Sequence, residues 1–127
     1  MLPALDNARV AVIGLGYVGL PLATAFGRHF PTTGFDISTR RIEQLRAGRD
    51  VTGEVSAEEL AASPRLGVTA DEAELKAANV YIVTVPTPID EAKRPDMHAL
   101  VSASETVGRV IGPGDVVIYE STVYPGA

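Results

Sequence analysis

The sequence lacks cysteine and tryptophan entirely, and its 127 residues contain no long apolar run. Without cysteine the chain has no disulfide, no thiolate to bind zinc and no cysteine nucleophile. No apolar stretch approaches the length of a membrane span, and Met1–Asp6 is too short and too interrupted to be a signal peptide. These absences predict a cytoplasmic protein that does not insert into membranes.

Basic residues are also scarce. Eleven Lys and Arg stand against 16 Asp and Glu, so the formal net charge is −5. An acidic chain is a poor partner for the phosphates of nucleic acids or anionic lipids, and we expect neither as a ligand. The two histidines, His29 and His98, have no second candidate ligand at a metal-binding spacing, so the sequence predicts no metal site.

Strands and helices are expected to alternate along the chain. Short apolar runs predict strands at about 9–13, 33–36, 66–69, 80–85 and 116–119, with helical patterns between them. Right-handed crossovers then predict an α/β fold, a doubly wound parallel sheet of about five strands in the order 3-2-1-4-5. We expect residues 1–8 to be a leader and residues 9–127 to form one domain.

Capping signals predict where the helices begin and end. The first helix is expected at about Tyr17–His29, and Ser38 should begin another that Gly48 ends. Two capping boxes, Ser56–Glu59 and Thr69–Glu72, predict further helix starts. Four residues of the first helix, spaced four apart, are expected to share one apolar face: Val18, Leu22, Phe26 and Phe30.

The first strand runs directly into a Gly-x-Gly-x-x-Gly motif with glycines at 14, 16 and 19. This order of strand, glycine turn and helix is the context that a dinucleotide-binding fingerprint needs. Gly14 allows the tight turn, Gly16 lets the backbone approach a pyrophosphate, and Gly19 lets helix and strand pack closely. The helix N-terminus would add N–H groups and a partial positive charge. The motif predicts a Rossmann-type site.

Asp36 supports this interpretation, because it ends the second predicted strand about 20 residues beyond the glycines, where such folds bind the adenosine ribose. A carboxylate there accepts hydrogen bonds from the ribose hydroxyls and repels a 2′-phosphate, which favours NAD over NADP. Arg40 and Arg41 leave an alternative open. They could bind a 2′-phosphate, lie along the adenine, or be solvated at the start of a helix.

Distinctive residues follow four of the predicted strands, at 14–19, at Asp36, at 84–88 and at 120–122. Ligands of open parallel sheets bind outside the carboxyl ends of the strands, at the point where strand order reverses. The agreement of four strand ends indicates one ligand site at that edge.

Four sequence blocks, at 14–23, 34–36, 85–88 and 120–126, resemble the NAD-binding domain of the UDP-glucose/GDP-mannose dehydrogenase family. The resemblance implies a full-length enzyme, expected to be a homo-oligomer. It would oxidise the C6 hydroxyl of a nucleotide-linked sugar to a carboxylate with two NAD. Blocks around Pro86–Asp90 and Glu120–Gly126 look closer to the branch that oxidises UDP-N-acetylhexosamines for surface polysaccharides. In this family the second oxidation uses a cysteine outside the region of resemblance, so this chain alone is expected to be inactive.

The resemblance also assigns residues. Gly14, Gly16 and Gly19 match the pyrophosphate turn, Asp36 the ribose ligand, and Arg41 a basic residue near the adenosine. Thr122 matches a threonine near the nicotinamide and the catalytic water, and is the one catalytic candidate, although Ser-Thr before a loop is as often a turn or a cap. The expected cofactor-binding residues are Gly14, Gly16, Tyr17, Val18, Gly19, Asp36, Arg41, Val85, Pro86, Thr87, Ser121 and Thr122.

Two alternatives remain open. Another two-domain dehydrogenase, of the 3-hydroxyacyl or 6-phosphogluconate type, would share the glycine turn but should lack Val85-Pro86-Thr87-Pro88 and Ser121-Thr122. A stand-alone NAD-sensing module without catalysis would bind NAD tightly as a stable monomer.

Overall fold

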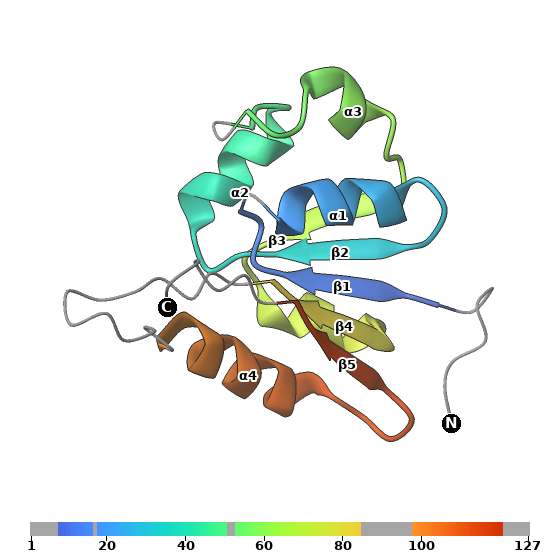
Figure 1. Ribbon diagram of the computed structural model, residues 1–127, viewed down its shortest axis with the longest axis vertical. Helices are drawn as coiled ribbons and strands as arrows, with labels where there is room; N and C mark the ends of the chain where they lie inside the picture. Colours follow the sequence, from blue (N-terminus) through green and yellow to red (C-terminus); the bar gives the residue numbers. More distant parts are fainter. Residues whose placement is uncertain (1–7, 17, 51–52, 85–97, 121–127) are drawn as a thin grey trace, which may run out of the picture.

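The computed structural model describes residues 8–16, 18–50, 53–84 and 98–120. Within these ranges, five strands form one parallel sheet in the order β3-β2-β1-β4-β5 (Figure 1). They are β1 (Val10–Ile13), β2 (Thr32–Phe35), β3 (Leu66–Thr69), β4 (Val80–Val83) and β5 (Val116–Tyr119). The predicted fold class and strand order are confirmed. Of the leader expected at residues 1–8, residues 1–7 lie outside the described part.

The register brings the carboxyl ends of the strands level. Ile13, the last residue of β1, pairs with Phe35 of β2 on one side and with Val83 of β4 on the other. Phe35 in turn pairs with Thr69, and Val83 with Tyr119. Side chains that follow any of these strands therefore start from the same edge of the sheet.

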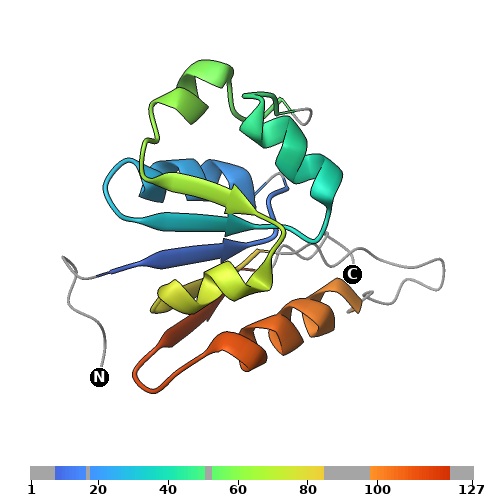
Figure 2. The ribbon, with the colours of Figure 1, turned by 180° about the vertical axis from the view of Figure 1, so that it is seen from behind.

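Helices cover both faces of the sheet (Figures 1 and 2). One face carries α1 (Gly19–Gly27), α2 (Thr39–Arg46) and the short α3 (Ala57–Ala61), and the other carries the 3₁₀ helix η2 (Glu72–Ala77) and α4 (His98–Val110). Alternate residues of β1 feed the two cores: Val10 and Val12 pack with α1 and α2, whereas Ala11 and Ile13 pack with η2 and α4. Burial of β1 on both faces explains its unbroken apolar sequence.

The inward face of α1 differs from the prediction. None of the four expected residues is among its buried residues, which apart from Leu20 are small: Gly19, Leu20, Ala23, Thr24 and Gly27. Val18 is 43% exposed, while Leu22, Phe26 and Phe30 flank the core and are only partly buried. The reason is steric: α1 lies so close to the sheet that a Cβ on Gly27 would stand 2.7 Å from the Cβ of Leu66. The bulky side chains therefore pack beside the contact.

Two of the three predicted helix caps are confirmed, and one is wrong. Ser38 accepts a hydrogen bond from the N–H of Arg41, and Ser56 forms a complete capping box with Glu59. The box predicted at Thr69 does not form, because Thr69 is the last residue of β3 and Asp71 caps η2 instead.

Candidate functional site

The turn between β1 and α1 lies at the level edge where the strands end. Gly14 has a φ of +97°, a conformation that side-chain-bearing residues rarely adopt. Its N–H donates to the carbonyl of Phe35 at 2.8 Å, which ties the turn to the end of β2. The turn is therefore fixed by the neighbouring strand as well as by its own sequence.

Gly19 and Gly16 differ in the space around them. A Cβ on Gly19 would stand 1.7 Å from the carbonyl oxygen of Gly14 and 2.4 Å from Oγ1 of Thr84, so α1 starts in direct contact with the turn. A Cβ on Gly16 would meet no heavy atom of the described residues within 4 Å. Gly16 thus leaves open space on the turn, which is what the close approach of a pyrophosphate requires.

The N-terminus of α1 opens beside this space. No acidic residue lies in its first turn, and Val18, at the N-cap position, makes no side-chain capping bond in the described part of the chain. The N–H groups of a first helical turn and the helix dipole favour an anion at such an end. The turn and the helix together suit a negatively charged ligand.

Asp36 stands directly after β2, as predicted, and its carboxylate is oriented by backbone groups. Oδ2 accepts a hydrogen bond from the N–H of Leu15, and Oδ1 accepts one from the N–H of Ser38, both at 2.9 Å. Each oxygen keeps a further lone pair, so the half-buried carboxylate can also accept hydroxyl groups from a ligand. Its position at the turn fits a ribose adjoining the pyrophosphate.

Arg41 points inward from α2. Its Nε donates to the carbonyl of Leu15 and its Nη1 pairs with Asp50, both at 2.8 Å. The two side chains are 10% and 0% exposed, respectively. The remaining nitrogen, Nη2, is buried without a hydrogen-bond partner among the described residues. Arg40 on the same helix is exposed.

Thr84 is a residue of the site that sequence reasoning missed, beyond placing it at a strand end. It follows β4, is 6% exposed, and donates its hydroxyl to the carbonyl of Gly14 at 2.7 Å, with a longer contact to that of Ile13. The available signal was a polar residue at the carboxyl end of a buried strand. Asp50 was also missed, because nothing in the polar segment around it distinguishes a buried carboxylate from an exposed one.

Of the predicted cofactor-binding residues, the structure describes some and not others. Gly14, Gly16, Gly19, Asp36 and Arg41 converge at the turn, and Val18 lies at its end. The remainder lie outside the described residues, and their roles stay predictions: Tyr17, Val85, Pro86, Thr87, Ser121 and the catalytic candidate Thr122.

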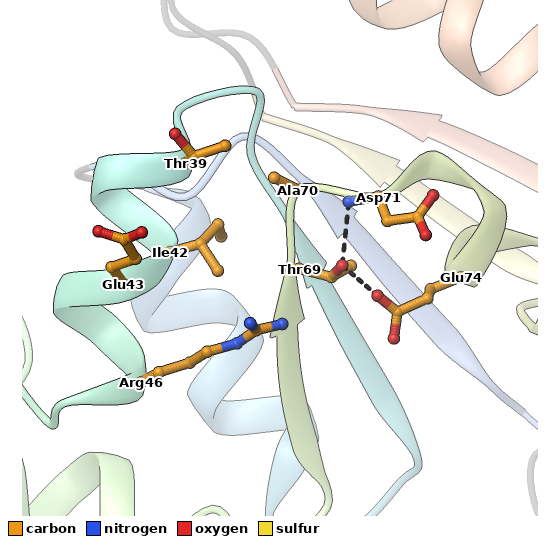
Figure 3. A pocket seen from close by; sticks show the side chains of 8 residues that line it. All are labelled: Thr39, Ile42, Glu43, Arg46, Thr69, Ala70, Asp71 and Glu74. Atoms are coloured by element: carbon orange, nitrogen blue, oxygen red, sulfur yellow. Dashed lines mark hydrogen bonds between the residues drawn. The ribbon is translucent and has the colours of Figure 1, made fainter.

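A hollow of about 360 Å³ lies between α2 and the end of β3 (Figure 3). It adjoins the site, because the N–H of Asp36 donates to the carbonyl of Thr69. Three carboxylates line it, and Arg46, its one basic side chain, donates two hydrogen bonds to the carbonyl of Val68. The hydroxyl of Thr69 is bonded to Glu74 and to the N–H of Asp71. This acidic lining does not suit a pyrophosphate, so the hollow does not compete with the glycine turn as the candidate anion site.

Two features are absent from the described residues. Across residues 8–16, 18–50, 53–84 and 98–120, no group of three or more His, Asp or Glu side chains is arranged to hold a metal ion. In the same part of the chain, no helix combines the length and apolar character needed to cross a membrane.

Comparison with known proteins agrees with this geometry. Residues 8–127 match the model of the UDP-glucose/GDP-mannose dehydrogenase family, NAD binding domain. The chain is 56% identical over 123 residues to UDP-N-acetyl-D-glucosamine 6-dehydrogenase of Pseudomonas aeruginosa, covering 97% of the chain and 29% of that protein. It is 51% identical over 122 residues to the enzyme of the same name from Salmonella typhi, covering 96% and 29%.

Solved structures give the same result. The UDP-D-ManNAc dehydrogenase of Pyrococcus horikoshii superposes with a TM-score of 0.81 at 36% identity, over 93% of this chain and 29% of that one. The chain thus spans about 29% of the length of the relatives it matches. Sequence motifs, sheet order and comparisons converge, and the chain belongs to the UDP-glucose/GDP-mannose dehydrogenase family, of which it is the NAD-binding domain.

Proposed function

We propose that this domain supplies the NAD site of an enzyme that oxidises the C6 hydroxyl of a UDP-sugar, a UDP-N-acetylhexosamine, to the uronic acid. The observation that carries the substrate class is the 56% identity to a UDP-N-acetyl-D-glucosamine 6-dehydrogenase over 97% of the chain. A relative called Protein CapL, from Staphylococcus aureus, is 49% identical. We place the product in surface polysaccharide synthesis.

The residues present fit NAD. Gly16 leaves the open surface on which the pyrophosphate would lie, at the N-terminus of α1, and Asp36 would accept hydrogen bonds from the adenosine ribose. NAD supplies the acceptor for hydride from the sugar carbon, and this chain's residues bind and orient it. Val18, Gly14 and Gly19 complete the turn. Thr122, and the block that contains Thr87, are expected on the nicotinamide side. The other cofactor-binding residues known here from sequence alone are Tyr17, Val85, Pro86 and Ser121.

The assignment of Arg41 as an adenosine contact is the least supported by the geometry. Its Nε and Nη1 are bonded to Leu15 and Asp50, and reaching a ribose or a 2′-phosphate would break those bonds. With Arg41 engaged and a carboxylate at the ribose position, the arrangement favours NAD over NADP.

Calorimetric titration with NAD and NADP tests the cofactor assignment. Asp36→Ala should weaken NAD binding by about ten- to hundredfold, since it removes charge-assisted hydrogen bonds. The preference for NAD over NADP should shrink. Glu43→Ala is the matched control, because Glu43 is a nearby carboxylate on α2 that lines the acidic hollow and does not contact the turn. Absence of NAD binding by the folded, unaltered chain would contradict the assignment.

A protein carrying this domain together with its remaining catalytic region tests the substrate class. We expect NAD reduction with UDP-N-acetylhexosamines, two NADH for each sugar, and a lower rate with UDP-glucose. Preference for UDP-glucose would overturn the proposed branch. We expect the full-length enzyme to be a cytoplasmic homo-oligomer, which light scattering after size-exclusion chromatography would check.

A further inference from the structure

Three side chains from separate elements hold the peptide groups of the glycine turn. Thr84, after β4, donates to the carbonyl of Gly14 at 2.7 Å, and Asp36, after β2, accepts from the N–H of Leu15 at 2.9 Å. Arg41, on α2, donates to the carbonyl of Leu15 at 2.8 Å. We call Thr84, Asp36 and Arg41 the turn clamp. Its three hydrogen bonds fix two successive peptide groups, Gly14–Leu15 and Leu15–Gly16.

The direction in which the N–H of Gly16 points follows from these bonds. The described residues contain no cis peptide bond, and in a trans peptide the C=O and N–H point in opposite directions. Because Arg41 holds the carbonyl of Leu15, the N–H of Gly16 in the same peptide group points away from Arg41. That N–H donates to no group in the described part of the chain. It remains available to a ligand on the open side of Gly16.

Arg41 is itself held in place. Oδ1 of Asp50 pairs with its Nη1, while Oδ2 of Asp50 accepts hydrogen bonds from the N–H groups of Glu54 and Val55. Val55 is 4% exposed and belongs to the core beneath α1 and α2. The guanidinium position is therefore set by the packed interior of the domain. The side chain of Asp50 is fully buried and Thr84 is nearly so, and both lie too deep to touch a ligand on the turn.

We propose that Thr84 and the Arg41–Asp50 pair are positioning residues for the cofactor: they hold the carbonyls of Gly14 and Leu15 so that the N–H of Gly16 faces the pyrophosphate. This inference rests on the proposed NAD-binding function. It assigns Arg41 a role through the turn instead of a contact with the adenosine.

Thr84→Val tests the inference, because it keeps the branched shape and replaces the hydroxyl with a methyl group that cannot donate a hydrogen bond. Thr32→Val is the matched control: Thr32 is 4% exposed on β2, and its hydroxyl also donates to a backbone carbonyl, that of Phe30, at the opposite edge of the sheet. Thr84→Ser, which retains the hydroxyl, is the rescue variant. Asp50→Asn provides a second, independent perturbation of the clamp.

Affinities for NAD, ADP and adenosine give the first readout, by calorimetry or NMR titration. Thr84→Val should weaken NAD and ADP by about two- to tenfold, the loss of one hydrogen bond, and leave adenosine unchanged. Thr84→Ser should restore both affinities, and Thr32→Val should change none of the three. A merely structural role would lower all three affinities together or none, and either result would overturn the inference.

Amide hydrogen exchange without ligand gives the second readout and separates this inference from the proposed function. Exchange at the N–H groups of Gly14 and Leu15 should quicken in Thr84→Val and Asp50→Asn, and stay unchanged in Thr32→Val. If the unaltered chain bound no NAD, the proposed function would fail, while unchanged exchange in both variants would refute the clamp itself.

Discussion

Replacing Gly19 with alanine puts a carbon atom where the fold has no room for one. The added Cβ would stand 1.7 Å from the carbonyl oxygen of Gly14, whereas such contacts are essentially never found below 3.0 Å. The oxygen belongs to the backbone of the turn and is bonded to Thr84, so it cannot rotate aside. Either α1 or the turn must move by about 1 Å or more.

The expected change in the free energy of unfolding is the sum of two opposing effects. Forced overpacking costs about 1–3 kcal/mol and sometimes more, and a clash with backbone belongs at the upper end. Alanine in place of glycine in a helix returns about 0.5–1 kcal/mol. We expect Gly19→Ala to lower the free energy of unfolding by about 2–3 kcal/mol, a large share of the 5–15 kcal/mol typical of a domain.

Urea unfolding followed by circular dichroism measures this loss. With a slope of about 2 kcal/mol per molar urea, the midpoint should fall by about 1 M. Gly16→Ala is the control, because its Cβ would meet no described heavy atom within 4 Å. Its midpoint should stay within about 0.3 M of the unaltered chain. Under the proposed function, Gly16→Ala should nevertheless weaken NAD binding, since the methyl group would stand on the pyrophosphate surface.

Two results would refute the reasoning. An unchanged midpoint for Gly19→Ala would mean that α1 does not pack against the turn at the distance described. Equal losses for Gly19→Ala and Gly16→Ala would mean that the effect comes from replacing any glycine of the motif, and not from this contact.

Other substitutions test the rest of the fold. Tyr81→Phe should cost about 1–2 kcal/mol, because the buried hydroxyl donates to two backbone carbonyls. Burial raises the pKa of Tyr81, so the contribution of the neutral phenol to the free energy of unfolding is complete below the ordinary tyrosine pKa and is lost as pH rises through the raised value. In urea unfolding at a series of alkaline pH values, Tyr81→Phe should therefore lose less stability with rising pH than the unaltered chain. Ser56→Ala should cost about 1 kcal/mol by removing the capping box with Glu59, measured as a lower midpoint. The hydrogen bond from Arg109 lowers the pKa of Glu72, so this exposed pair stabilises the fold above the ordinary glutamate pKa, and the stabilisation is lost as pH falls through the lowered value. Glu72→Gln should abolish this contribution to the fall of stability at acid pH. The same dependence of the urea midpoint on pH in the variant and the unaltered chain would contradict the prediction.

Much of the fold could be predicted from sequence because its signals are local. The strands at 66–69 and 116–119 are found at the predicted bounds, and the order of the sheet follows from alternation and crossover handedness. The capping box at Ser56 spans four residues and forms as expected. The box at Thr69 fails because β3 pairing holds Thr69 in extended backbone, a constraint from another segment.

The candidate site divides in the same way. Asp36 was predicted from its spacing to the glycines, and the structure brings it to the turn. Thr84 contacts the carbonyl of Gly14 across a separation of 70 residues, and no local pattern encodes that contact. The inward face of α1 escaped prediction because helical periodicity identifies apolar residues, whereas close packing on the sheet selected Ala23 and Gly27.

By itself, the sequence determined the parallel α/β fold, the glycine turn, the carboxylate after β2 and the family. These depend on residue types at fixed short spacings, which hydrophobic periodicity and backbone sterics translate directly into structure. Only the tertiary structure decided that Arg41 faces inward to Leu15 and Asp50, and that Thr84 holds the turn. A long polar side chain has many rotamers, and its partner is chosen by segments that meet only when the sheet has formed.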